Sequence, residues 1–260
     1  MAEWACVTGA SAGIGAEFAR QLAARGSDLA LVARRRDRLD ALAAELAAQH
    51  GVRAEAITAD LTDAAQLEAL AQRLAEAPPD LLVNNAGFGT AGALAQLAPA
   101  RELEQVRILV LAVVRLTHAV LPAMLARGSG GILNVSSLAG EAPGPFNATY
   151  AASKAFVTSF SEALYEETRG RGVRVMALLP GFTATEFRAV AGVSLDTIPR
   201  AARLSPEFVV REALRDFERG APRSVPGAAY KLAAAAEGAL PRAWIRRIVG
   251  GVWRRAQPPG

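Results

Sequence analysis

TGASAGIG, residues 8–15, lies between a short apolar segment and a longer amphipathic one. Its three glycines permit a tight turn and let phosphate oxygens approach backbone N–H groups, and the N-terminus of a following helix carries partial positive charge. This combination is typical of a strand–turn–helix unit that binds a dinucleotide, although the spacing departs from G-x-G-x-x-G and an ordinary glycine-rich turn is the alternative. We predict cofactor contacts from Gly9, Ser11, Gly13, Ile14 and Gly15.

Short apolar runs and longer amphipathic segments alternate along the rest of the chain. The runs read ACVTG, DLALVA, RAEAIT, DLLVNN, GILNVSS, VRVMALLP and RSVPG. Because this alternation indicates right-handed βαβ units, we expect an α/β fold: a single-domain, Rossmann-like, doubly wound parallel sheet of about seven strands flanked by helices. Ligands bind such sheets at the carboxyl ends of the strands. We assign residues 1–226 to a dinucleotide-binding catalytic domain and residues 227–260 to a C-terminal basic amphipathic extension.

Composition narrows the class of protein. The chain has 260 residues, 52% of them hydrophobic, and a mean hydropathy of +0.20. We expect no membrane span, because charges interrupt the apolar runs before the roughly 18 residues that a span needs. The first apolar run begins within three residues and leaves no room for a signal peptide, which predicts a cytoplasmic location. Cys6 alone forms no internal disulfide, and His50 and His118, far apart in sequence, indicate no metal site.

The basic charge needs an explanation. The net charge is +4 and the isoelectric point is about 9.8. The arginines are spread over several predicted helices and do not gather with aromatic residues on one face, so we predict no nucleic-acid partner.

The arginine run after the second apolar segment is a separate case. NAD sites place Asp or Glu there to bind the ribose 2′-OH, whereas NADP sites use arginine for the 2′-phosphate. This chain has Ala33 followed by Arg34 and Arg35. We therefore predict NADP(H) as the cofactor, a merely solvated arginine run being the alternative.

Two further strand ends carry candidate cofactor contacts. Asp60 and Leu61 follow the third run, although Thr62 or Asp63 there would serve to cap the next helix. The fourth run ends in the motif NNAG, whose small residues allow close packing against a ligand. The contacts predicted from this motif are Asn85, Ala86 and Gly87.

The strongest chemical signal follows the fifth run, which ends in Ser136 and Ser137. Tyr150 stands thirteen residues after Ser137, and Lys154 lies one helical turn further on, so phenol and ammonium share a helix face. A nearby cation lowers a phenol pKa of about 10, which makes tyrosine a usable general acid and base. Only two of the 29 basic residues are lysines, and a compact ammonium with a tunable pKa explains why position 154 has one. Ser137 can stabilise a substrate carbonyl oxygen.

Together these motifs resemble the short-chain dehydrogenase/reductase family, in the form with TGxxxGIG, NNAG, a catalytic serine, YxxxK and PG, over residues 4–226. The resemblance implies that Tyr150 is the acid/base, that Lys154 contacts the nicotinamide ribose and that Ser137 orients the substrate. It also implies homodimers or homotetramers through helices around residues 101–127 and 150–169. Further cofactor contacts that it implies come from Asp60, Leu61, Asn85, Pro180, Gly181 and Thr183.

One position departs from the family pattern. Counting back from THAVLP, the family usually has Asn where this chain has Leu109. That Asn helps to kink its helix and to hold a water in the proton relay to the lysine. Leucine supplies no amide, so the departure affects proton relay and not hydride transfer.

We therefore expect an NADP(H)-dependent oxidoreductase that acts on an apolar ketone, aldehyde or secondary alcohol. The irregular segment 183–204 is long enough for an active-site lid. The alternatives are a non-catalytic NADP(H)-binding sensor or scaffold and a membrane-surface lipid-carbonyl reductase, whose tail would use a basic amphipathic helix; packing of that helix on the domain or on a partner subunit is favoured over membrane contact. The expected substrate contacts and pocket walls are Ser137, Leu138, Phe146, Phe182, Phe88 and Phe187.

Overall fold

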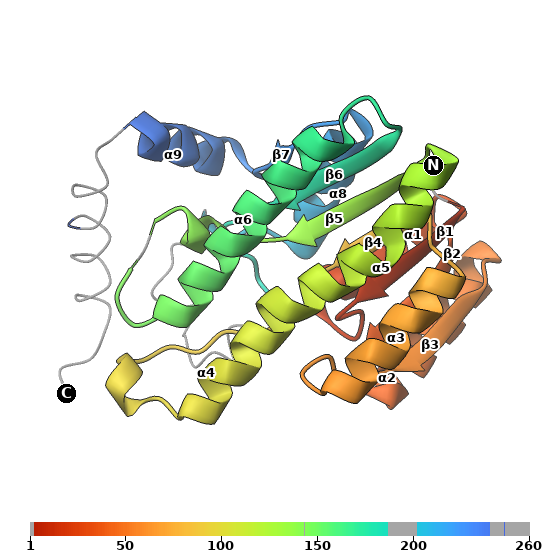
Figure 1. Cartoon of the computed structure of the whole chain (residues 1–260), viewed down its shortest axis with the longest axis horizontal. Coiled ribbons are helices and arrows are strands. Elements are labelled where there is room, and N and C mark those ends of the chain that lie inside the picture. Colours follow the sequence, from red (N-terminus) through yellow and green to blue (C-terminus); the bar gives the residue numbers. More distant parts are fainter. Residues whose placement is uncertain (1–2, 143, 187–201, 240–246, 248–260) are drawn as a thin grey trace.

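A seven-stranded parallel sheet runs through the computed structural model in the order β3-β2-β1-β4-β5-β6-β7, which confirms the predicted doubly wound fold (Figure 1). The structure describes residues 3–142, 144–186, 202–239 and 247. The order reverses between β1 and β4, so the topological switch point lies at their carboxyl ends. The strands are β1 (Trp4–Thr8), β2 (Asp28–Ala33), β3 (Ala54–Thr58), β4 (Leu81–Asn84), β5 (Gly130–Val135), β6 (Val173–Leu178) and β7 (Arg223–Ser224).

Helices cover both faces of this sheet. Side chains from α1, α2 and α8 form one buried cluster with the sheet, and side chains from α3, α5 and α6 form the other. Within β1, Ala5 and Val7 belong to the first cluster and Cys6 to the second, as the alternating faces of a strand require. The helices are α1 (Gly13–Ala23), α2 (Arg36–His50), α3 (Ala64–Glu76), α4 (Pro99–Val106), α5 (Ala112–Arg127), α6 (Ala148–Thr168), α8 (Pro206–Glu218) and α9 (Ala228–Ala239), with short turns η1 (Leu94–Gln96) and η3 (Leu138–Gly140).

The helix formed by α4 and α5 is interrupted by η2 (Arg107–Leu111), which is π-helical. By length and composition alone, Pro99–Arg127 could cross a membrane, with a mean hydropathy of 2.1 in its most apolar window. Arg115 interrupts the apolar run between Arg107 and Arg127, as expected, so the helix reaches this hydropathy with a charge inside it. In the structure, 44% of that window is buried inside the protein. The apolar face of α5 packs against α3 and the sheet through Leu116 and Val120.

The glycine turn after β1 has backbone angles and space that only glycine fits. Gly9 and Gly13 have φ values of +69° and +56°, which favour glycine. A Cβ on Gly15 would lie 2.3 Å from the carbonyl oxygen of Gly9, so any side chain there would push α1 away from β1. Gly15 therefore serves the close packing of helix on strand, and the sequence interpretation of TGASAGIG as a strand–turn–helix is confirmed.

The two described ends of the segment after β6 lie beside each other. Thr183 pairs with Leu204 in an isolated parallel bridge, the Leu204 N–H donates to the Phe182 carbonyl and the Ala184 N–H donates to the Leu204 carbonyl. The predicted lid at residues 183–204 is thus described only at its two ends. Phe187 and the tail residues 240–246 and 248–260 lie outside the described part of the chain, and the domain boundary at residue 226 stays a prediction.

Candidate active site

A cavity of about 550 Å³ extends along the carboxyl ends of the strands. Among the residues that the structure describes, it brings together every predicted cofactor and substrate residue except Gly15 and Phe146. Gly15 packs beneath the glycine turn instead of lining the cavity. Phe146 does not line it either, contrary to our expectation of a pocket wall: its backbone has φ +68°, the left-handed conformation, and its carbonyl accepts a hydrogen bond from Gly92 N–H.

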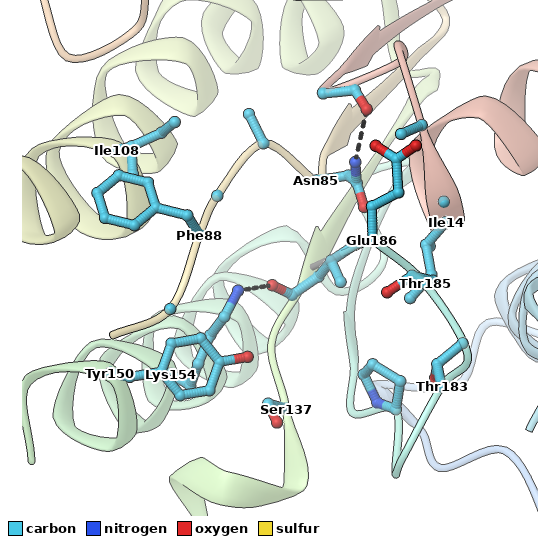
Figure 2. A pocket seen from close by; sticks show the side chains of 18 of the residues that line it. Ile14, Asn85, Phe88, Ile108, Ser137, Tyr150, Lys154, Thr183, Thr185 and Glu186 are labelled. Atoms are coloured by element: carbon cyan, nitrogen blue, oxygen red, sulfur yellow. Dashed lines mark hydrogen bonds between the residues drawn. The ribbon is translucent and has the colours of Figure 1, made fainter. Parts of the chain in front are cut away.

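Tyr150 and Lys154 project from the first turns of α6 into this cavity (Figure 2). The Lys154 Nζ lies 5.8 Å from the centroid of the Tyr150 ring, so the two side chains share one face of the helix, as their spacing predicts. Ser137 follows the end of β5 and lines the same cavity. Its Oγ accepts a hydrogen bond from Ala139 N–H at 3.1 Å, which fixes the hydroxyl at the start of η3.

The loop after Ser137 lies unusually close to α6. A Cβ on Gly140 would be 2.6 Å from the backbone nitrogen of Ala155 and 2.7 Å from the carbonyl carbon of Lys154. Ser136 Oγ donates to the Lys154 carbonyl at 2.7 Å and lies 2.7 Å from Thr158 Oγ1. These contacts attach the end of β5 to α6. They therefore keep Ser137, which follows β5, close to the Tyr150–Lys154 pair on α6.

The ammonium group of Lys154 is buried. Its side chain is 5% exposed and Nζ donates to the Val135 carbonyl at 2.6 Å. Burial disfavours the charged form and lowers the pKa of Lys154 from 10.5 to about 7. Near neutral pH Lys154 is therefore present both as the amine and as the ammonium. Arginine in this place would stay charged at every pH, which supports the reading that position 154 needs a tunable cation.

The TG and NNAG motifs brace one another at the switch point. Thr8 Oγ1 accepts hydrogen bonds from the N–H groups of Asn85 and Ala86, at 2.9 and 3.0 Å. Asn85 Nδ2 donates to the Thr8 carbonyl at 2.9 Å. The Asn85 amide thus holds the β1 and β4 ends together, while Asn85, Ala86 and Gly87 line the cavity.

The predicted 2′-phosphate arginines lie at the other end of the cavity. Arg35 donates from Nε and Nη2 to Ser11 Oγ at 3.1 and 3.0 Å. Arg34 lies 3.7 Å from Asp60. Partial burial acts to raise the pKa of Asp60, but hydrogen bonds from Thr62 and the charge of Arg34 together lower it, so this carboxylate is ionised. Asp63 caps α3 by accepting from Gln66 N–H, as the alternative for this segment anticipated.

Leu109 stands where the family usually has Asn, and the helix is still interrupted at this point by η2. It lies in the π-helical η2 and is 1% exposed. A Cβ on Gly87 would lie 2.5 Å from Leu109 Cδ2, so the leucine packs directly on the NNAG glycine. π-helical segments occur often at functional sites, and here the backbone irregularity is present although the amide is not.

Tyr230, on α9, is a cavity residue that sequence reasoning missed. Its ring lies against Gly181, where a Cβ would be 2.4 Å from Cζ. Its hydroxyl donates to the Ala202 carbonyl at 2.6 Å and accepts from Phe182 N–H at 3.1 Å. One hydroxyl therefore joins both ends of the segment after β6. No motif marks this residue, because its partners lie 28 and 48 positions away.

Replacing Tyr230 by phenylalanine is expected to lower the free energy of unfolding by about 1–2 kcal/mol, since it removes two hydrogen bonds. The ring stays in place against Gly181, so the change isolates the hydroxyl. Urea denaturation followed by circular dichroism measures the difference. A variant as stable as the parent would show that this hydroxyl does not hold the loop ends.

The fold and the site together define a class of protein. A doubly wound sheet with a serine and a tyrosine–lysine pair at the carboxyl ends of its strands is the arrangement of a nucleotide-dependent oxidoreductase. A family model described as short chain dehydrogenase matches residues 3–193. The chain therefore belongs to the short-chain dehydrogenase family, which confirms the resemblance, and it is an oxidoreductase acting on CH–OH or C=O groups.

Three individual proteins of known name or structure are similar to this chain. The very-long-chain 3-oxoacyl-CoA reductase of Anas platyrhynchos is 35% identical over 217 residues, covering 81% of this chain and 67% of the relative. A short-chain dehydrogenase from Sphingobium yanoikuyae, solved in complex with NADPH, has a TM-score of 0.84 and 39% identity, covering 91% of this chain and 92% of that one. The bulky-bulky ketone specific alcohol dehydrogenase from Comamonas testosteroni has a TM-score of 0.78 and 33% identity, covering 91% and 93%.

Proposed function

We propose that this protein is an NADP(H)-dependent reductase of apolar ketones, with Tyr150 as the general acid. The observation that carries the proposal is that one cavity holds Tyr150, Lys154 and Ser137 at one end and Arg35 and Ser11 at the other. A dinucleotide with a 2′-phosphate requires both ends at once. The NADPH complex of the Sphingobium yanoikuyae relative supports the same cofactor.

The residues present fit a dinucleotide. The glycine turn leaves no room for side chains at Gly9, where a Cβ would lie 2.7 Å from Asn85 Nδ2, so a ligand there meets backbone N–H groups. The cofactor would be held by this turn, by Arg35, by Lys154 and by Thr183. When bound, NADPH supplies the hydride.

Side chains of the protein bind the substrate carbonyl oxygen and supply the proton that it receives. Ser137 hydrogen-bonds the substrate carbonyl oxygen and stabilises the charge that develops on it. Tyr150 gives its phenolic proton to the same oxygen. Lys154 stabilises the phenolate that remains, since a neighbouring ammonium favours the charged form.

The substrate class follows from the walls of the cavity. Large apolar side chains line the same cavity as Ser137 and Tyr150, and 3-oxoacyl-CoA and bulky ketones appear in the names of two relatives. Both substrates carry a sizeable group on each side of the carbonyl. We infer a ketone of this type over a small aldehyde. The large side chains of this lining include Phe88, Ile108, Leu138, Phe182 and Tyr230.

The test follows NADPH oxidation with a panel of carbonyl compounds. A long-chain 3-oxoacyl thioester, a bulky aryl ketone, acetone and acetaldehyde separate large from small substrates. Turnover of the first two supports the proposal, and preference for the small pair would overturn the substrate class. NADPH binding without turnover of any carbonyl would favour the sensor or scaffold alternative.

The cofactor assignment makes a separate prediction. Arg35→Ala is expected to weaken NADPH binding by about 10- to 100-fold and NADH binding hardly at all, because only NADPH has the 2′-phosphate and hydrogen bonds between charged groups are strong. Fluorescence titration of both cofactors measures this. Arg36→Ala is the matched control, since Arg36 pairs with Asp40 at 2.7 Å on the surface of α2. Equal losses for the two cofactors would contradict the assignment.

We also propose a homodimer or homotetramer through α4, η2 and α6. These elements expose Leu103, Leu111 and Phe156 at 58%, 54% and 41%, and Phe156 stacks on Phe160 with ring centroids 5.7 Å apart. Such exposed apolar groups favour a protein contact. The cytoplasmic location and the membrane contact of the tail stay predictions.

A further inference from the structure

Glu186 lies at the edge of the cofactor cavity, beside the predicted 2′-phosphate site. Its carboxylate oxygens accept hydrogen bonds from Arg38 Nη1 at 2.9 Å and from Arg35 Nη1 at 3.0 Å. The opposite edge of the Arg35 guanidinium binds Ser11 Oγ. Figure 2 shows Glu186 on the side of the cavity where Ile14 lies, well away from Tyr150. An acidic side chain is therefore paired with Arg35, one of the two arginines predicted to bind the 2′-phosphate.

The backbone fixes Glu186 in this place. Its neighbour Thr185 packs on the glycine turn, where a Cβ on Gly13 would meet Thr185 Cγ2 at 3.1 Å. The segment after β6 therefore crosses the turn, and Glu186 reaches the β2–α2 connection beyond it. The ion pairs with Arg38 and Arg35 lower the pKa of Glu186 below its ordinary value, so the carboxylate is charged near neutral pH.

A bound 2′-phosphate would require the same donors. Arg35 has two edges, one on Ser11 and one on Glu186, and a phosphate held by Arg35 takes hydrogen bonds from at least one of them. Glu186 is an anion and repels a phosphate placed beside it. NADH has a hydroxyl in place of the phosphate and leaves the Arg35–Glu186 pair undisturbed.

We propose that Glu186 is a specificity-determining residue that weakens the preference for NADPH over NADH by competing with the 2′-phosphate for Arg35. The inference rests on the proposed NADP(H) function. It predicts that the chain without this carboxylate discriminates more strongly between the two cofactors. Both arginines and the glutamate are about half exposed, at 42%, 44% and 54%, so the competition is partly screened by salt.

Glu186→Gln keeps the shape of the side chain and removes its charge. We expect NADPH to bind about three- to tenfold more tightly, the size of one or two partly exposed ion pairs, and NADH to change by less than about twofold. Calorimetric or fluorescence titration at low salt measures both affinities. Repeating the titration at high salt should reduce the gain for NADPH.

Asp40→Asn is the matched control. It removes one negative charge from the same arginine-rich stretch, but Asp40 pairs with Arg36, which does not line the cavity. This variant should bind NADPH as the parent does. An equal gain in NADPH affinity for both variants would mean that only the net charge of the protein matters, and it would overturn the inference.

Two other results would also overturn it. Weaker NADPH binding by Glu186→Gln would mean that the glutamate holds the arginines in place, and equal gains for NADPH and NADH would exclude competition with the 2′-phosphate. Failure of the proposed function would give a different result in the titration. The unaltered chain would then bind neither NADPH nor NADH, or it would prefer NADH. If the unaltered chain prefers NADPH and Glu186→Gln binds it no better, only this inference fails.

Discussion

Tyr150→Phe is expected to lower kcat for ketone reduction by about 10²- to 10⁴-fold, the range that general acid–base catalysis supplies. The phenylalanine ring fills the same space over Lys154, so substrate and NADPH binding should change by no more than about threefold. The loss should therefore fall on kcat and not on the cofactor's Kd. Steady-state kinetics with the best ketone of the panel, together with an NADPH titration, measures both quantities.

Tyr165→Phe is the matched control for this change. Tyr165 lies on the same helix, α6, and packs against the core cluster formed with α3 and α5, outside the cavity. Its loss of a hydroxyl should leave kcat unchanged. If Tyr150→Phe turned over ketones as fast as the control, Tyr150 would not be the acid and the mechanism would be wrong.

Local sequence patterns predicted those parts of the site that depend on one element or on one strand end. Tyr150 and Lys154 are one helical turn apart, and that spacing alone places them on one face. The glycine turn and NNAG follow adjacent strands of a parallel sheet, so the topology brings them together. These predictions needed only the alternation of strands and helices, which the chain shows clearly.

The rest of the site depends on contacts between distant segments. Glu186 meets Arg38 across 148 residues and Arg35 across 151, and Tyr230 reaches Phe182 across 48. Phe146 was misplaced because its left-handed backbone carries no sequence signal in a non-glycine residue. The family's Asn helps to kink its helix, and in this chain a π-helical turn forms at Leu109 without that amide. In each case tertiary packing, and not local propensity, decides the conformation.

Lys154→Met is expected to lower kcat by about 10²-fold or more, because the phenolate of Tyr150 loses its neighbouring cation. The same change should alter how stability depends on pH, through an independent physical effect. Burial lowers the pKa of Lys154 from 10.5 to about 7. Between these values an unfolded chain binds a proton at this residue and the folded, cofactor-free chain does not.

The direction in which stability changes with pH follows from that difference in bound protons. Stability rises with pH wherever the unfolded state binds more protons, so Lys154 destabilises the fold fully below about pH 7 and progressively less as pH rises toward 10.5. The slope that it contributes approaches about 1.4 kcal/mol per pH unit in this window. Lys154→Met should lack this slope and should be the more stable protein at pH 7.

Urea denaturation of the cofactor-free protein from pH 6.5 to 10 measures the slope. Lys231→Met is the matched control, since Lys231 is the other lysine of the chain and is exposed on α9; its stability should follow the parent at every pH. If the parent and Lys154→Met gave parallel curves, the ammonium would not be desolvated in the folded state. Lys154 would then remain an ordinary charged lysine, and its effect on Tyr150 would come from charge alone, without the pKa near 7 that burial confers.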